Sequence, residues 1–314
     1  MSAPGPVLAH FGSVTEGMLQ LLRASVPDVE FVACEPDGTP PPTGSEILVA
    51  LAYDAGGMER ALAPSVRWVH LLGAGADGFP LDAVGERTLT CSRGASAPAI
   101  AEFVLAVILA FEKQLPQSWI TGPPEGRSLA RLGGLRGLTV GVVGLGAIGT
   151  EVAVRALAFG TRVVGLRRTR APSPVDGVEL AGSLHELLAR SDHVVVAAPA
   201  TAATHHLIDA AAFEAIKPGA HLVNVARGAL VDQDALLAAL DSGRVAMASL
   251  DVVDPEPLPA GHPLYTHPRV RLSPHISWSS PDTMDRTVTL FAENLRLYRA
   301  GRPLRGVVDL AAGY

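Results

Sequence analysis

Short apolar runs rich in Val, Ile and Leu alternate along this chain with Ala- and Leu-rich stretches of helical period, and Gly, Pro or Asp separates most of them. This alternation predicts parallel strands, because a strand that returns in the same direction needs a crossover on one face of the sheet. The 314 residues suffice for about two domains, and the 48% hydrophobic content supplies their cores. We expect an α/β protein with two doubly wound parallel sheets joined by two long helices.

The apolar runs predict strands over 7–11, 30–34, 47–51, 68–72, 88–91, 139–143, 162–166, 193–197, 220–225, 246–252 and 271–273. The stretches between them predict helices over 15–24, 58–63, 98–114, 147–159, 183–189, 233–241 and 281–300. The helix over 98–114 is apolar nearly all round, so we expect it to be buried between domains or against a second copy. The last helix is expected to cross back, which gives a discontinuous substrate domain of 1–98 with 284–314 and a dinucleotide domain of 99–283.

Composition excludes several partners. The 25 basic and 31 acidic residues leave a net charge of −6, so we expect neither nucleic acid nor an anionic membrane as a partner. No apolar stretch reaches the ~18 residues of a membrane-spanning helix, and the first residues lack the features of a secretory signal, so we expect a cytoplasmic protein. Cys34 and Cys91 are far apart, and His205 and His206 show no ligand spacing, so we expect buried thiols and no metal.

A glycine motif follows the predicted strand 139–143. The segment Gly144-Leu145-Gly146-Ala147-Ile148-Gly149 matches G-x-G-x-x-G, although 32 glycines in 314 residues would give about 0.3 such matches by chance. Its position between an apolar strand and a helix is more specific, because free backbone N–H groups at a helix start can hold a pyrophosphate. We predict a Rossmann dinucleotide-binding domain that uses Gly144, Gly146, Ala147, Ile148 and Gly149; a purely structural turn is the alternative.

The end of the next predicted strand bears on the choice between NAD and NADP. An Asp or Glu about 20 residues beyond the glycines ordinarily binds the adenosine ribose of NAD. Arg167 stands there in this chain, followed by Arg168 and Thr169. Guanidinium groups bind a 2′-phosphate that a carboxylate would repel. We therefore predict that NADP(H) is preferred, with NAD(H) as the alternative if the arginines form only a solvated turn.

Three polar segments follow later predicted strands, at the sheet edge where such folds bind ligands. They are Asn224-Val-Ala-Arg227-Gly, Asp251-Val-Val-Asp-Pro-Glu256-Pro, and Pro274-His275-Ile-Ser-Trp278. With the loop Gly73-Ala-Gly75-Ala-Asp77 and the segment 92–102, they make the chain resemble the D-isomer-specific 2-hydroxyacid dehydrogenase family nearly end to end. Within that family it is most similar to the glyoxylate and hydroxypyruvate reductases, through Pro255-Glu-Pro-Leu-Pro259 and the 19-residue step from Glu256 to His275.

The chemistry that this resemblance implies suits three of these residues. Reduction of a 2-oxoacid needs a cation for the carboxylate, a proton donor for the carbonyl oxygen and a hydride donor beside C2. Arg227 offers a planar fork of donors to carboxylate and ketone oxygens. His275 is of the side-chain type that exchanges protons near neutral pH, and Glu256 can orient its ring and stabilise the imidazolium.

The resemblance also implies contacts for residues outside this group of three. Asp251 would contact the nicotinamide amide, and Pro199 and Thr204 would line the cofactor. Backbone N–H groups of Ala74 and Gly75 would bind the substrate carboxylate. The resemblance further implies a homodimer, with which the apolar helix over 98–114 is compatible.

The resulting hypothesis is an NAD(P)-dependent D-2-hydroxyacid dehydrogenase that reduces a small 2-oxoacid, such as glyoxylate or hydroxypyruvate, with NADPH and with His275 as general acid. Trp278 stands where it could sort substrates by size, or it serves only packing. NAD-dependent phosphoglycerate oxidation, with Arg93 on the phosphate, is one alternative that Arg167 disfavours. Formate oxidation is disfavoured by the charged Glu256, since that relative has a neutral Gln beside its His. A non-catalytic, dinucleotide-sensing co-repressor is the alternative from another class.

Overall fold

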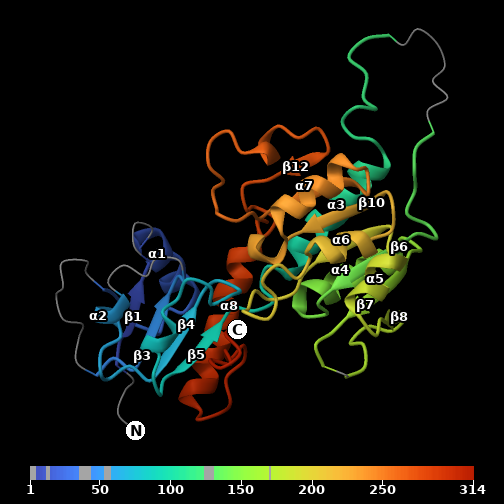
Figure 1. Ribbon diagram of the computed structural model, residues 1–314. Helices are drawn as coiled ribbons and strands as arrows, with labels where there is room; N and C mark the ends of the chain where they lie inside the picture. Colours follow the sequence, from blue (N-terminus) through green and yellow to red (C-terminus); the bar gives the residue numbers. More distant parts are fainter. Residues whose placement is uncertain (1–4, 12–14, 35–43, 53–57, 124–130, 170) are drawn as a thin grey trace. The chain divides into compact units, whose positions relative to one another are not determined.

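The computed structural model describes residues 5–11, 15–34, 44–52, 58–123, 131–169 and 171–314. The chain divides into two compact units, one of Met1–Ser96 with Ser280–Tyr314 and one of Ala97–Ser279. Each unit is built on its own parallel sheet (Figure 1). The predicted α/β class with two doubly wound parallel sheets is therefore confirmed.

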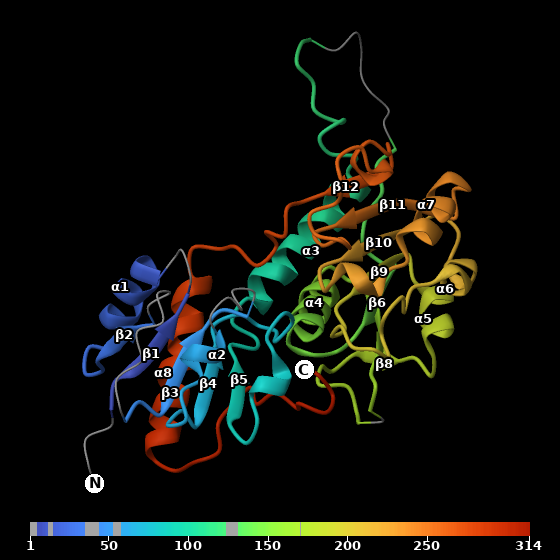
Figure 2. The same ribbon diagram turned by 60° about the vertical axis from the view of Figure 1, so that its left-hand side comes forward.

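The first unit contains a five-stranded sheet in the order β2-β1-β3-β4-β5, with every neighbouring pair parallel. Its strands are β1 (Val7–His10), β2 (Phe31–Ala33), β3 (Ile47–Ala50), β4 (Trp68–Leu71) and β5 (Thr88–Cys91). Its helices are α1 (Thr15–Ser25), α2 (Met58–Ala61) and α8 (Thr283–Arg299), with a 3₁₀ turn η2 (Leu81–Ala83). Side chains of α1 and α8 share a core with alternate residues of β1, β3 and β4, so the late helix α8 completes a sheet made by the first hundred residues (Figure 2).

A buried polar network crosses the strands of this first sheet. The Trp68 indole N–H donates to Thr90 Oγ1 at 2.8 Å. The ring of His70 lies 2.7 Å from the same oxygen and 3.0 Å from Ser92 Oγ. Burial lowers the pKa of His70 to about 3, so the ring is neutral in the folded protein.

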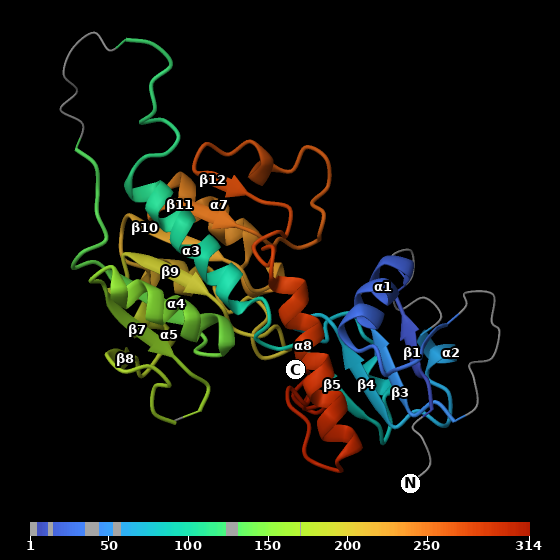
Figure 3. The ribbon, with the colours of Figure 1, turned by 180° about the vertical axis from the view of Figure 1, so that it is seen from behind.

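The second unit contains a seven-stranded parallel sheet in the order β12-β11-β10-β9-β6-β7-β8. Its strands are β6 (Thr139–Val143), β7 (Arg162–Leu166), β8 (Val178–Leu180), β9 (His193–Val196), β10 (Ala220–Asn224), β11 (Val245–Leu250) and β12 (Val270–Leu272). Its helices are α3 (Ala97–Glu112), α4 (Ala147–Ala158), α5 (Leu184–Arg190), α6 (Ala210–Ala215) and α7 (Gln233–Asp241), with 3₁₀ turns η3 (Gly228–Leu230) and η4 (Pro263–Tyr265). One face of the sheet is covered by α3 and α4, and the other by α5, α6 and α7 (Figure 3).

The start of helix α5 is fixed by its cap. Ser183 Oγ accepts the Glu186 N–H at 3.2 Å, while the Glu186 carboxylate accepts the Gly182 N–H at 2.8 Å, so a capping box closes one residue earlier than usual. The long apolar helix ends at Glu112, two residues short of the predicted end. Its buried side chains pack on α4 and on the sheet of its own unit, which accounts for much of its apolar composition.

The two cysteines differ in their surroundings. Cys91 is buried, and burial raises the pKa of its thiol to about 12. Cys34 is only half-buried, so the expectation of two buried thiols was wrong for this residue. Within the described ranges, every helix is too short or too polar to cross a membrane.

Candidate active site

The predicted functional residues of the second unit follow the carboxyl ends of its strands. Because all seven strands run in parallel, the segments after β6, β7, β9, β10, β11 and β12 leave the sheet at one edge. This edge therefore gathers the glycine motif and the polar segments around Arg227, Asp251 and His275.

The three glycines of the motif differ in the space around them. Gly144 has φ +101°, a conformation that favours glycine. A Cβ there would stand 2.8 Å from the carbonyl oxygen of Ala197, which directly follows the neighbouring strand β9. A Cβ on Gly149 would come within 1.9 Å of the Gly144 carbonyl oxygen, so glycine permits helix α4 to approach the loop. A Cβ on Gly146, the N-cap of α4, would meet nothing within 4 Å among the described residues. The side at which a pyrophosphate would approach the helix start is therefore open.

Arg167 directly follows β7 and turns back onto its own loop. Its guanidinium donates to the Ala171 carbonyl at 3.4 Å and also to the Pro172 carbonyl. Arg168 and Thr169 are exposed beside it. Arg167 thus holds this loop through its own hydrogen bonds, a role that the sequence pattern did not reveal.

The loop after β9 is closed by Thr204. Its hydroxyl donates to the Pro199 carbonyl at 2.8 Å and accepts the Thr201 N–H at 2.8 Å. The two residues predicted to line the cofactor are thereby joined in one compact turn at the carboxyl edge of the sheet.

The turn after β10 presents Arg227. Asn224, 1% exposed, accepts the Ala226 N–H at 3.1 Å and donates its side-chain amide to the Arg227 carbonyl at 2.9 Å. A Cβ on Gly228 would lie 2.0 Å from the backbone of Val253, so only glycine permits the turn to approach the segment after β11 so closely. These two residues were not among the predicted site residues, and their effect is to fix the base of Arg227.

Glu256 and His275 are paired as predicted. The imidazole Nδ1 lies 2.7 Å from Glu256 Oε1, and both side chains are about two-fifths exposed, at 40% and 41%. Gln233, at the start of α7, supports the segment that carries Glu256: its side-chain oxygen accepts the Asp254 N–H at 3.2 Å and its nitrogen donates to the Asp254 carbonyl. One imidazole nitrogen is therefore committed to the carboxylate, which leaves Nε2 for proton exchange.

Asp251 is 2% exposed and holds the turn on which His275 stands. Its Oδ1 accepts the Ser273 hydroxyl at 2.6 Å and the Ile276 N–H at 2.9 Å. Its Oδ2 accepts the Ser277 N–H at 2.9 Å. An ionised carboxyl oxygen can accept two bonds, so Oδ2 retains the capacity for a further donor.

Trp278, predicted either to sort substrates or to pack, is 44% exposed. Its indole Nε1–H donates to the His275 carbonyl at 2.8 Å.

Ala74 and Gly75 belong to the first unit, in the loop after β4, where Ala74 is exposed and Gly75 half-buried. Their backbone groups follow the carboxyl end of a central strand in that sheet, as the glycine motif does in the other.

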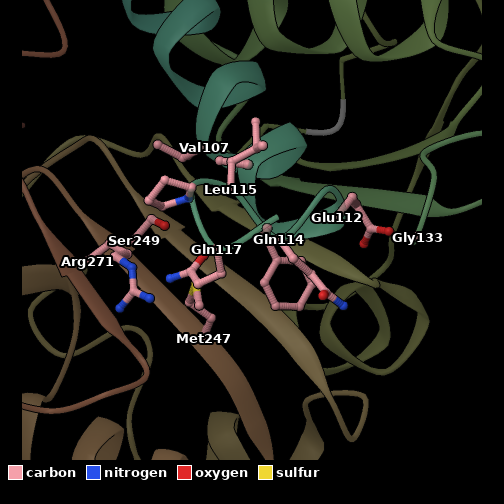
Figure 4. Close-up of a pocket in the computed structure, with 12 residues that line it drawn as sticks. Val107, Glu112, Gln114, Leu115, Gln117, Gly133, Met247, Ser249 and Arg271 are labelled. Atoms are coloured by element: carbon pink, nitrogen blue, oxygen red, sulfur yellow. The ribbon is translucent and has the colours of Figure 1, made fainter. Parts of the chain in front are cut away.

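A cavity of about 660 Å³ lies elsewhere in the second unit (Figure 4). It is lined by the end of α3, by the segment that follows, and by Met247, Ser249 and Arg271 of the two outer strands. None of the predicted catalytic residues is among the twelve that line it. We therefore place the candidate active site at the carboxyl edge of the sheet and not in this cavity.

Comparison with known proteins identifies relatives of the chain. The family model described as D-isomer specific 2-hydroxyacid dehydrogenase, NAD binding domain, matches residues 106–277. The human glyoxylate reductase/hydroxypyruvate reductase is 33% identical over 264 residues, which cover 80% of this chain and 79% of the relative. A D-3-phosphoglycerate dehydrogenase from Mycobacterium bovis is 36% identical over 284 residues, which cover 87% of this chain and 52% of the relative. The chain thus spans about half the length of the phosphoglycerate dehydrogenases it matches.

A solved structure extends the similarity to both units. The D-isomer specific 2-hydroxyacid dehydrogenase from Xanthobacter autotrophicus Py2, in complex with NADPH and MES, superposes with a TM-score of 0.84 at 30% identity. The match covers 99% of this chain and all of that one.

Proposed function

Because the chain belongs to the D-isomer specific 2-hydroxyacid dehydrogenase family, we propose that it reduces a small 2-oxoacid, of the glyoxylate or hydroxypyruvate kind, to the D-2-hydroxyacid with NADPH. The observation that carries the proposal is the 2.7 Å contact between His275 Nδ1 and Glu256 Oε1. It pairs a proton-exchanging ring with a carboxylate at the sheet edge where this fold binds its ligands.

The carboxyl edge of the second sheet has the features that a dinucleotide requires. The loop of Gly144 to Gly149 would hold the pyrophosphate, since Gly146 leaves open space at the start of α4. The turn of Pro199 and Thr204 would line the cofactor. Asp251 Oδ2 would accept a hydrogen bond from the N–H of the nicotinamide amide. When bound, NADPH supplies the hydride that reaches C2 of the oxoacid.

The substrate would be held by charge and by main-chain donors. The Arg227 guanidinium would bind the carboxylate and the ketone oxygen, and a planar fork can orient both at once. The backbone N–H groups of Ala74 and Gly75 would also bind a substrate carboxylate, as the family resemblance implies.

Proton transfer would be the task of His275. Its Nε2–H would donate a proton to the carbonyl oxygen as C2 gains the hydride, so the carbonyl group becomes an alcohol with both electrons and the proton accounted for. Glu256 keeps the ring oriented through Nδ1 and stabilises the positive charge that the ring carries before it loses the proton.

Preference for NADPH rests on Arg167, Arg168 and Thr169, where a carboxylate would select NAD. Arg167 donates to the carbonyls of Ala171 and Pro172, so it can act on a 2′-phosphate either directly or by holding the loop that presents Arg168. Both routes place positive charge beside the adenosine ribose.

Quaternary structure follows the same family. We propose a homodimer in which the partly exposed apolar side chains of α3, including Phe103, Val107 and Leu109, face a second copy. Light scattering coupled to size-exclusion chromatography would give a mass near twice 32.6 kDa; a monomer at micromolar concentration would refute this part.

The alternative function is oxidation of phosphoglycerate, which the 36% identity to the mycobacterial enzyme favours. Arg93, exposed after β5, would then contact the phosphate.

Both functions are tested by one experiment in which NADPH and NADH consumption is followed with a panel of 2-oxoacids, including a phosphorylated one. We expect turnover of glyoxylate or hydroxypyruvate that His275→Asn lowers by about 10²- to 10⁴-fold. Turnover of only the phosphorylated substrate would support the alternative, and dinucleotide binding without turnover would support a sensor.

A further inference from the structure

His275 has an unusual backbone conformation for a residue with a side chain. Its φ is +53°, in the left-handed region that disfavours every residue with a Cβ. A strained conformation of this kind persists only where its surroundings fix it. The hydrogen bonds around the residue show what does so.

The peptide group between His275 and Ile276 is held from both sides. Its carbonyl accepts the Trp278 indole N–H at 2.8 Å, and its N–H donates to Asp251 Oδ1 at 2.9 Å. The preceding peptide is held as well, because the His275 N–H donates to the Asp251 carbonyl at 3.0 Å. With both flanking peptide planes fixed, the direction of the His275 Cβ is fixed, and with it the approach of Nδ1 to Glu256.

The position of Trp278 fits this purpose better than core packing. The side chain is 44% exposed, whereas the indole of Trp68 in the first unit is completely buried. A large ring that stays so exposed gains little from burial. Its N–H makes a well-formed bond to the one carbonyl that sets the conformation of the proposed acid.

We propose that Trp278 is a positioning residue for His275, through the indole N–H bond to the His275 carbonyl. This inference rests on the proposed function, because it concerns how efficiently His275 delivers its proton. It assigns to Trp278 a role in the rate of the chemical step, in place of the substrate sorting or the packing that the sequence left open. Asp251 and Trp278 then form a clamp on opposite sides of one peptide group.

The test is Trp278→Phe, which removes the N–H but keeps an apolar ring. We expect kcat to fall about ten- to hundredfold, because a displacement of about 1 Å in an acting group has that effect. KM for the oxoacid and the Kd of NADPH should change less than threefold, and the deuterium isotope effect with NADPH labelled at the transferred position should rise. Ser242→Ala, which removes a 3.1 Å side-chain bond to a carbonyl at the end of α7, is the matched control and should leave kcat unchanged.

Two results would overturn the proposal. The first is a Trp278→Phe enzyme with wild-type kcat, and the second is one whose KM values shift with substrate size while kcat for the smallest oxoacid is retained. If wild-type protein reduces no oxoacid, the proposed function fails, and crystal structures of the variant then decide the positioning role separately. We expect His275 to leave the left-handed region and its Nδ1 to move away from Glu256; an unmoved His275 refutes the role. Circular dichroism of the variant establishes that it is folded before either comparison is made.

Discussion

Acid should destabilise the second unit through a buried histidine remote from the proposed chemistry. His221, the second residue of β10, is 0% exposed. Its Nε2 lies 2.9 Å from Ser249 Oγ, and its ring stacks on Phe111 with centroids 4.7 Å apart. Burial lowers the pKa of His221 to about 3, so the folded protein keeps the ring neutral.

The sign of the effect follows from proton uptake on unfolding. An unfolded histidine has a pKa near 6.5, so between about pH 6.5 and pH 3 the unfolded chain binds a proton that the folded chain does not. The contribution of neutral His221 to the free energy of unfolding is therefore fully present above pH 6.5. It falls as the pH decreases, by up to about 1.4 kcal/mol per pH unit. At about pH 5 the loss is roughly 2 kcal/mol, a large part of the ~5–15 kcal/mol typical of a folded domain.

Neighbouring groups modify this slope. His193 stands beside His221 with ring centroids 5.6 Å apart, and burial lowers its pKa to about 4, so it adds a loss of the same sign. Glu112 lies 3.3 Å from His193 Nε2, and burial raises the pKa of this carboxyl, which opposes part of the loss. Burial alone would raise the pKa of Asp192, but hydrogen bonds from Lys217 and Thr139 outweigh burial and lower this pKa. Protonation of Asp192 at still lower pH therefore also destabilises the fold.

The assay is urea unfolding followed by circular dichroism at several values between pH 7 and pH 4.5. His221→Phe keeps a ring against Phe111 but cannot titrate, so the slope of unfolding free energy against pH should decrease by about 1.4 kcal/mol per unit below pH 6. Ser249→Ala removes the hydrogen bond and leaves the histidine, so it should lower stability at every pH with the slope retained. Equal slopes for wild type and His221→Phe would refute the reasoning.

Three further predictions concern the site. His275→Asn should lower kcat about 10²- to 10⁴-fold with the Kd of NADPH nearly unchanged, and retention of most turnover would contradict the proposed acid role. Arg227→Lys should raise KM for the oxoacid and lower kcat, together about tenfold or more, because lysine keeps the charge and loses the planar fork; unchanged kinetics would place Arg227 outside the site. Arg167→Asp should reverse a preference for NADPH of roughly 30-fold, the equivalent of about 2 kcal/mol, and a wild-type kcat/KM for NADH that equals that for NADPH at low salt would refute it.

Much of the fold could be predicted because hydrophobic periodicity is a local property of the chain. Strands such as β6 and helices such as α7 have the predicted ends. Hydrophobic periodicity did not predict β8 and α6. β8 has three residues and α6 has six, too few for a hydrophobic period to be recognised. α6 carried one local signal, an Asp209 N-cap that accepts the Ala212 N–H at 2.8 Å.

The site was predictable to the extent that side-chain type and strand order determine it. Glu256 and His275 are separated by 19 positions yet meet at 2.7 Å, as the chemistry of the two side chains and their places after predicted strands indicated. The supporting contacts were not predictable, because a Gln at a helix start or a Ser after a strand is common in any chain. Gln233 and Ser273 gain their meaning only from the backbone and carboxyl groups that the fold brings to them.

Strand β10 joins the acid-sensitive core to the proposed chemistry. His221 faces α3 near the start of the strand, whereas Asn224 at its end supports the turn of Arg227. Loss of activity at low pH therefore has two separable sources, which are titration within the site and unfolding of the sheet that presents it. His221→Phe should alter only the second, because the ring contacts Ser249, Phe111 and His193, which lie outside the proposed site. An acid limb of inactivation that moves in this variant, while kcat near pH 7 is retained, would be assigned to unfolding and not to proton transfer.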